Sequence, residues 1–558
     1  MTGIGRFRAA VIILSAAFLL YGGDAVAGYF LAHLRDGLQT RLDRPVLSPE
    51  IAGNAAILCD PLLLHRFYKE RDFRPAWFDQ TGISTQADAL IARIRRVSGD
   101  GLRPDDYHIA RIEELLSLVH DSESLVSSYD LFVDLDILLT DAFFACASNL
   151  LSGRVSPEIT YIIWNGSTRE ADPVHLLNTA IGSFDVESTL DSMNPPHEGY
   201  RLLRTALARY REIVIGGGWP PVPAGPALKR GDRDERVPSI REHLLRTGDL
   251  ELNDPADPTV FDKEFEQALR RYQKRHGILE DGVIGPVTTA RLNIPAEDLV
   301  VKIILNMERW RWLPEDFGEE YIMVNIADFT LQAYRDRVVE RAMRVIVGTN
   351  YRRTPIFSSV ITSVILNPAW YVPATIAVED IIPQILRNPR YLADRNIHVL
   401  ESWRHDAPEI DPATVNWETY QAYNFPYLLK QDPGPLNPLG RIKFMIPNKF
   451  DVYLHDTPQK ELFENIRRGF SSGCIRIEKA VDLAEFLLCE EPAWNRKTIE
   501  ETIASGKRRE IKLKKQVPVH LLYWTAWVDD NGQVNFREDI YERDTILSAA
   551  LHEKPPGF

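Results

Sequence analysis

The spacing of apolar residues changes once along the chain, and this change constrains the fold more than any other feature. From about residue 61 to 213, apolar side chains recur every three or four positions, as in HIARIEELLSLV and GYRLLRTALARYREI. That period predicts amphipathic helices. After residue 321 the pattern becomes short apolar alternations broken by polar turns, as in VNIADFTLQAYRDRVVERAMRVIVG, and this predicts strands. We therefore expect a multi-domain α+β chain, with a helical domain over residues 50–215 and a β-rich domain over residues 321–510.

A small helical module is expected between these two regions. Residues 216–228 read GGGWPPVPAGPAL, a composition that predicts a linker. Residues 229–295 contain three short amphipathic segments, with Gly277 expected to end the second helix and Pro286 to begin the third. Residues 296–320 then predict a connecting helix. At roughly 150 residues per domain, about three or four folding units account for the chain.

The β-rich region contains an interruption and is followed by further structure. Residues about 375–436 are polar, punctuated by proline and partly helical in pattern, so we expect a lid inserted into the β domain. Residues 511–545 predict a β-hairpin that turns at Asn531 and Gly532. Residues 546–558 are expected to form a tail.

The N-terminus predicts export. Arg6 and Arg8 precede an apolar run, and the small residues Ala25 and Ala27 form a cleavage-like site. The run is short compared with the ~20 residues of a membrane span, so residues 1–27 predict a cleaved signal peptide. An uncleaved leader is the alternative and would be the only expected membrane contact.

Composition excludes some partners. The net charge is −14 and no basic stripe is present, which argues against a nucleic-acid partner. An anionic ligand would need a few well-placed cations, because the overall field repels it. No cofactor motif is present, and no metal site is expected because His455 and Asp456 lack a second ligand at a useful spacing.

One of the four cysteines has unusual surroundings. Cys59, Cys146 and Cys489 lie in apolar runs and are expected to pack, with a disulfide as the alternative for Cys59 and Cys146, whereas Cys474 lies in SSGCIR. The following run, IEKAVDLAEFLL, predicts a helix directly after Cys474, whose N-terminus would favour the thiolate. His455 ends a predicted strand, DVYLH, and is the natural base for the thiol proton.

Neighbouring residues complete a candidate site. The backbone N–H groups of Gly473 and Cys474 are expected to stabilise an oxyanion. Arg476 is expected to bind a substrate carboxylate, with pairing to a nearby Asp or Glu as the alternative. Tyr453 shares a strand face with His455 and is expected either to line the acyl site or to pack. Asn367, Trp370 and Tyr371 of the LNPAWYVP segment are candidates for the substrate groove, and simple packing is the alternative for the aromatic pair.

The Cys–His–Arg constellation resembles the catalytic motif of the L,D-transpeptidases, in which a His and a spacer precede Ser/Thr-His-Gly-Cys-x-Arg. Ser472 stands where the common form has a second His, as in the large multi-domain Gram-negative branch of that family. This substitution leaves open which group orients His455: a backbone carbonyl or a local hydroxyl, with Ser472 as a candidate.

The resemblance covers roughly residues 50–545. FYKERDFRPAWF and DGLRPDDYH look like the scaffold domain of that branch, and ALRRYQKRHG followed by DGVIGPVTTARLN resembles peptidoglycan-binding domain 1. The resemblance implies a periplasmic enzyme that acts on peptidoglycan stem peptides and glycan, with other cell-wall synthesis proteins as conceivable partners. Cys474 would attack the donor stem between its third and fourth residues and pass the acyl group to a diaminopimelate amine, giving a 3→3 cross-link. The resemblance also implies a role in cell-wall organisation and cell shape, and acylation of Cys474 by carbapenems.

Other interpretations remain open at this point. With water as acceptor the same acyl-enzyme gives an L,D-carboxypeptidase or a cross-link hydrolase. A papain-like hydrolase usually has its Cys before its His, and a sortase has its Arg farther downstream. A non-enzymatic wall-binding scaffold protein is the remaining class, and the wall-binding-like module itself is either a binding unit or a spacer.

Overall fold

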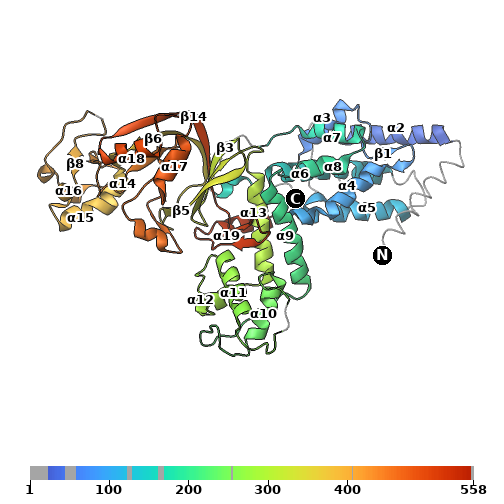
Figure 1. The fold of residues 1–558 in the computed structure, drawn as a ribbon. Helices are drawn as coiled ribbons and strands as arrows, with labels where there is room; N and C mark the ends of the chain where they lie inside the picture. The colour runs from blue at the N-terminus through green and yellow to red at the C-terminus, as the bar shows by residue number, and fades with distance from the viewer. Residues whose placement is uncertain are drawn as a thin grey trace.

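The computed structural model describes residues 23–43, 58, 60–121, 129–160, 169–252, 255–404 and 406–553. Most of the predicted leader therefore lies outside the described residues. Figure 1 shows three regions: an N-terminal helical region, a small helical module, and a β-rich region that carries a separate cap. Within the described residues, no helix combines the length and apolar character that crossing a membrane requires.

The N-terminal region is a helical domain built around one buried helix, α6. Asp136 of α6 is fully buried, and its carboxylate accepts hydrogen bonds from the Ala76 and Trp77 N–H groups and from the Tyr68 hydroxyl. These bonds tie the preceding loop to the helix. The helices are α2 Gly23–Leu42, α3 Pro61–Glu70, α4 Thr85–Arg95, α5 Ile109–Asp121, α6 Tyr129–Ser152, α7 Pro173–Gly182, α8 Val186–Ser192 and α9 Glu198–Ile215, with short 3-10 turns at Val97–Asp100, Pro104–Tyr107 and Pro157–Thr160 and a two-stranded ribbon of β1 Phe78–Asp79 and β2 Gly82–Ile83.

Helix α2 runs through the predicted cleavage site. Among the side chains that the structure describes, Phe30, Leu34, Leu38 and Leu42 pack into the core. Cleavage after Ala27 would leave these four contacts in the mature chain. Export itself stays a prediction.

The small module contains the three expected helices, α10 Val237–Arg246, α11 Lys263–Arg275 and α12 Pro286–Leu292. The composition of residues 216–228 predicted a linker. In the structure this segment is not loose. The indole of Trp219 stacks on His243 with ring centroids 3.9 Å apart, and its Nε1 donates to the Ile294 carbonyl. Aromatic burial therefore fixes this segment against the module.

Helix α13, Ala296–Arg311, does more than connect two domains. It packs along α9, and together they share a core with the hairpin of β15 Ala526–Val528 and β16 Val534–Phe536 (Figure 1). The buried Arg311 guanidinium pairs with Glu308 and also donates to the Tyr200 hydroxyl on α9. This joint links the helical region to the β-rich region.

The β-rich region is a nine-stranded sheet that closes on itself. The strand order is β12-β5-β13-β11-β10-β6-β14-β3-β4, and β4 also pairs with β5. Closure leaves most strands without a free edge. The strands are β3 Glu320–Asn325, β4 Thr330–Arg335, β5 Val338–Gly348, β6 Phe357–Leu366, β10 Ile442–Met445, β11 Leu454–His455, β12 Gly469–Ser471, β13 Ile475–Ile477 and β14 Arg509–Leu522, and the accompanying helices are α17 Ala480–Leu487, α18 Arg496–Ala504 and the 3-10 turn Lys460–Glu464.

The predictions of a β-hairpin over residues 511–545 and a tail over residues 546–558 need correction. Strand β14 pairs with β6 and β3, so it belongs to the barrel and not to a hairpin spanning 511–545. The hairpin is limited to β15 and β16. The described part of the predicted tail is the end of helix α19, Arg543–His552. Arg543, Asp544 and Leu547 of α19 are buried.

The expected insertion is a subdomain with its own core. It has a three-stranded sheet in the order β7-β9-β8 and a cluster that includes Val372, Ile381, Val399 and Leu429. It forms the cap at the end of the barrel (Figure 1). Its elements are β7 Trp370–Val372, α14 Ala374–Ile376, a π-helical turn Ala377–Ile381, α15 Ile382–Arg387, α16 Tyr391–Asp394, β8 Ile397–Leu400, 3-10 turns Pro412–Thr414 and Trp417–Thr419, and β9 Leu428–Gln431.

The buried His243 of the module predicts a stability that falls in acid. Neither of its ring nitrogens has a hydrogen-bond partner among the described residues. Burial, followed by the charges of Arg275 and Arg246, lowers its pKa to about 3. The unfolded chain, with a histidine pKa of roughly 6.5, binds the proton first, so stability is lost as the pH falls from about 6.5 towards 3. By pH 5 the loss is about 2 kcal/mol.

His243→Phe keeps the stack on Trp219 and removes the titrating group. Calorimetry of the full chain should therefore show a smaller fall in unfolding temperature between pH 7 and pH 5 than in the wild type. His175→Phe, at an exposed position of α7, is the matched control. An equal fall in both variants would contradict this account.

Candidate active site

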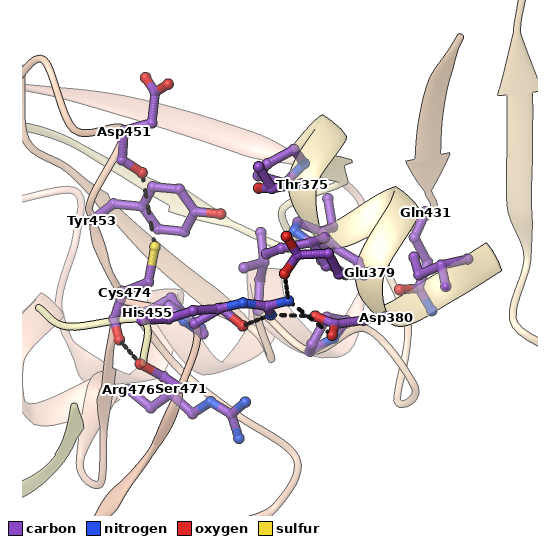
Figure 2. A pocket seen from close by; sticks show the side chains of 18 of the residues that line it. Thr375, Glu379, Asp380, Gln431, Asp451, Tyr453, His455, Ser471, Cys474 and Arg476 are labelled. Carbon is purple, nitrogen blue, oxygen red and sulfur yellow. Dashed lines mark hydrogen bonds and ion pairs between the residues drawn. The ribbon is translucent and has the colours of Figure 1, made fainter. Parts of the chain in front are cut away.

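A cavity of about 850 Å³ lies between the barrel end and the cap. Figure 2 shows side chains from both parts facing it. The lining residues that carry chemistry are Tyr453, His455, Ser472, Cys474 and Arg476 from the barrel, Arg352 from the loop after β5, and Trp370, Glu379 and Asp380 from the cap.

Cys474 lies between strands β12 and β13. The expectation that a helix follows it directly is wrong, because β13 intervenes and α17 begins only at Ala480. The N-terminus of α17 therefore does not directly follow this thiol. Gly473 before it has φ +111°, a conformation that other residues rarely adopt. Among the other cysteines, Cys146 is buried as expected, Cys489 is exposed, and Cys59 lies outside the described residues.

Hydrogen bonds fix the turn that carries Cys474. The Ser471 hydroxyl donates to the Cys474 carbonyl and accepts the Gly473 N–H at 3.1 Å. Thr354 Oγ1 donates to the Gly473 carbonyl at 2.8 Å. The Gly473 N–H is thus engaged and is not the free oxyanion donor that we expected. Among the described residues, the Cys474 N–H has no protein acceptor.

His455 lies on the strand next to the nucleophile. Strands β11 and β13 are parallel, with His455 paired to Arg476 and Leu454 to Ile475. His455 Nδ1–H donates to the Asp456 carbonyl oxygen at 2.5 Å, which leaves Nε2 as an acceptor. The group that orients His455 is therefore a backbone carbonyl. Ser472, the alternative, instead accepts a hydrogen bond from Arg352 Nη1 at 2.9 Å.

Burial sets the resting protonation of the pair. Burial, followed by the charge of Arg476, lowers the pKa of His455 to about 3. Burial also raises the pKa of the Cys474 thiol, against opposing effects of the Tyr453 N–H and hydroxyl, Lys443 and Arg476. At neutral pH the pair is therefore a thiol and a neutral imidazole, and the thiolate forms as the proton leaves.

The remaining predicted residues divide into two groups. Tyr453, Arg476 and Trp370 line the cavity. Arg476 Nη1 donates to Gln459 Oε1 at 2.8 Å, and within the described part of the chain Arg476 forms no ion pair with a carboxylate. The alternative of a nearby Asp or Glu partner is therefore not observed.

Asn367 and Tyr371 do not belong to the cavity. The Asn367 amide is buried and donates to backbone carbonyls before β14, among them Thr502 at 3.0 Å and Lys507 at 3.1 Å. Its role is to hold the end of β6. Tyr371 follows Trp370 on β7, and because successive side chains of a strand face opposite sides, it points away and is 39% exposed.

Four residues of the site were missed at the sequence level. Arg352 Nη1 contacts Asp380 at 2.5 Å, and Nη2 contacts Glu379, so this guanidinium joins the cap to the loop of Cys474. Lys443 on β10 is paired opposite His455, and its Nζ lies 3.7 Å from the centroid of the Tyr453 ring. These residues come from distant segments, and no spacing in the sequence indicates that they meet.

Family models match three separate parts of the chain. The model described as "L,D-transpeptidase catalytic domain" matches residues 319–515, "Scaffold domain" matches 63–207, and "Putative peptidoglycan binding domain" matches 233–292. The chain carries an L,D-transpeptidase catalytic domain. Its domain composition is that of the multi-domain L,D-transpeptidases that the sequence resembles, which confirms the resemblance and the expected fold class.

Individual relatives agree with the domain assignment. A Haemophilus influenzae protein named "Putative L,D-transpeptidase" is 37% identical over 253 residues, which are 45% of this chain and 50% of the relative. The chain thus matches about half the length of that relative. An N-acetylmuramoyl-L-alanine amidase, CwlM, from Mycobacterium tuberculosis is 35% identical over 71 residues, 12% of this chain and 18% of the relative. The crystal structure of an L,D-transpeptidase from Xylanimonas cellulosilytica shares 14% identity, covers 54% of this chain and 99% of its own, and has a TM-score of 0.18, too low to carry an argument.

The ion cluster of Arg352, Glu379 and Asp380 is expected to stabilise the position of the cap. Arg352→Ala removes the contacts to Glu379 and Asp380, a partly exposed network worth about 1 kcal/mol. Hydrogen exchange of the π-helical turn Ala377–Ile381 should then be about fivefold faster. Arg390→Ala, which removes an exposed cap arginine paired only with Asp394, is the control. Unchanged exchange in the Arg352 variant would show that the cluster does not hold the cap.

Proposed function

We propose that this protein is a peptidoglycan L,D-transpeptidase that forms 3→3 cross-links through a Cys474 acyl-enzyme. The observation that carries the proposal is that Cys474, in the turn directly before β13, and His455, on the neighbouring parallel strand β11, line one cavity of the matched catalytic domain. A nucleophile beside an oriented base is the arrangement that covalent acyl transfer needs.

The first half-reaction forms the thioester. His455 Nε2 accepts the Cys474 proton as Sγ attacks the carbonyl between the third and fourth residues of the donor stem. The Cys474 N–H, and the Tyr453 hydroxyl beside it, are the donors proposed for the developing oxyanion; one such donor is worth roughly 3 kcal/mol. The C–N bond then breaks, and the imidazolium of His455 protonates the departing D-amino acid.

The second half-reaction releases the product. The side-chain amine of an acceptor diaminopimelate attacks the thioester carbonyl and gives its proton to His455. The C–S bond breaks, and the thiolate takes back that proton. If water attacks instead, the product is a tripeptide stem.

Charged groups of the cavity suit a peptide substrate that carries carboxylates. Arg476 lines the cavity without a carboxylate partner among the described residues, so we assign it to a substrate carboxylate. A guanidinium suits that task because it presents paired donors. Trp370 of the cap forms part of the opposite wall and would limit the width of the groove.

Location and partners follow from the same proposal. The predicted leader would bring the enzyme to the periplasm, where peptidoglycan is both substrate and anchor. The wall-binding-like module would hold glycan or peptide near the cavity, or act as a spacer, and other cell-wall synthesis proteins are partners that the proposal leaves room for. Carbapenems would acylate Cys474, and cross-linking would contribute to cell shape.

Hydrolysis by the same acyl-enzyme is the second candidate, because the cavity is open enough to admit water as well as an amine. A non-enzymatic wall-binding role does not explain why the chain maintains an oriented His455 beside a half-buried thiol in one cavity.

Product analysis distinguishes these functions. Mature protein incubated with disaccharide-tetrapeptide should give a 3→3 dimer, detected by mass spectrometry. Tripeptide without dimer would support the carboxypeptidase, and neither product would refute the acyl-enzyme proposal. Cys474→Ala should abolish both products, whereas Cys489→Ala, at an exposed cysteine that does not line the cavity, should keep wild-type activity.

A further inference from the structure

Lys443 is a cation beside the nucleophile that the proposed mechanism does not yet use. Its Nζ lies 3.7 Å from the centroid of the Tyr453 ring, within the range of a cation–π contact. The Tyr453 ring centroid is 5.7 Å from that of His455, and Tyr453 also interacts with Cys474 through its N–H and hydroxyl. Tyr453 therefore joins Lys443 to both members of the reacting pair.

The strand register fixes this arrangement. Lys443 is opposite His455 in the β10–β11 pairing, and β11 in turn pairs with β13 directly after Cys474. Lys443, His455 and Arg476 thus occupy adjacent positions across three strands, and Cys474 lies two residues before Arg476, in the turn that leads into β13. A cross-strand neighbour cannot move away without breaking the ladder, so the charge has a fixed position.

The charge of Lys443 is not cancelled by an ion pair among the described residues. Its charged neighbours are Asp451, Arg508 and Glu510, together with Cys474. Glu510 is already paired with Arg508 at 2.9 Å, and Asp451 contributes its backbone carbonyl to the Cys474 sulfur at 3.8 Å. Its carboxylate points away from the sulfur (Figure 2). Lys443 and Arg476 therefore contribute a positive electrostatic potential at the Cys474 sulfur.

We propose that Lys443 is a positioning residue for acyl transfer, and that its ammonium, held against Tyr453, stabilises the Cys474 thiolate and destabilises the His455 imidazolium. This inference rests on the proposed function. A stabilised thiolate favours the attack at a half-buried cysteine that no helix directly follows. A destabilised imidazolium is a stronger acid, so it gives its proton more readily to the departing amine.

The test measures the thiolate directly. Rates of iodoacetamide alkylation at the Cys474 peptide, followed by mass spectrometry from pH 6 to pH 10, report the thiolate fraction. Lys443→Met removes the charge at similar length, and the inflection should rise by about one pH unit. Alkylation at pH 7 should then be about tenfold slower. Lys443→Arg should retain the wild-type inflection, and Lys443→Gln should repeat the shift of the Met variant.

Lys449→Met is the matched control, because Lys449 is an exposed lysine whose Nζ lies 5.8 Å from the Phe450 ring centroid. It should leave the Cys474 inflection unchanged. An unchanged inflection in both neutral Lys443 variants overturns the inference. A lowered inflection with faster alkylation also overturns it, because that result means that Lys443 only keeps the thiol buried.

The alkylation assay needs no peptidoglycan. It can therefore test the role of Lys443 independently of the proposed transpeptidase function. If the inflection shifts but wild-type protein forms neither dimer nor tripeptide, the electrostatic role stands and the proposed function fails. If products form but the inflection does not shift, the function stands and Lys443 has no such role. If both proposals hold, product formation by the Lys443→Met variant should recover as the pH is raised, because the thiolate fraction of Cys474 then increases.

Discussion

The parallel pairing of β11 with β13 is the constraint on which the site depends. It is a ladder of only two residue pairs, Leu454–Ile475 and His455–Arg476. Because the strands run in the same direction, the chain must cross over between them, and residues 456–474 provide that crossover. The nucleophile turn, the carbonyl that orients His455, and the cation Arg476 all lie within or directly beside this short ladder. A shift of one residue would turn each of these side chains to the opposite face.

The same ladder explains the electrostatics. Strands on both sides bury the pair, so the thiol and the imidazole are each neutral at rest, and charge separation is costly unless other groups offset it. The chain as a whole has a net charge of −14, yet Arg476 has no carboxylate partner among the described residues. A guanidinium without a carboxylate partner therefore lies where a thiolate and substrate carboxylates need it, which a global charge count does not reveal.

The sequence predicted local secondary structure well. It predicted tertiary contacts between distant segments poorly. The three helices of the small module, the strand that ends at His455, and the barrel-plus-insertion pattern each follow from hydrophobic periodicity and turn residues. The strand β13 was missed because three residues, Ile475–Ile477, are too short for a periodic signal, and the following helix dominated the pattern. Asn367 was misassigned because its role depends on the carbonyls of Thr502 and Lys507, which only the fold brings near. The Asp456 carbonyl that orients His455 has no side-chain signature at all.

The cap shows why the site has two halves. Its core, around Val372 and Leu429, is separate from the barrel core, so the cap can keep its own structure whatever its contact with the barrel. At the cavity that contact includes Arg352, whose guanidinium bridges Ser472 beside the nucleophile to Asp380 of the cap. A partly exposed ion cluster is a weak link compared with a shared apolar core. The thiol and its base are therefore fixed by the barrel ladder, while the wall formed by Trp370 belongs to a subdomain with its own core, whose contacts at the cavity include the Arg352 ion cluster. A substrate carboxylate that reached Arg352 would compete with Glu379 and Asp380 for its guanidinium.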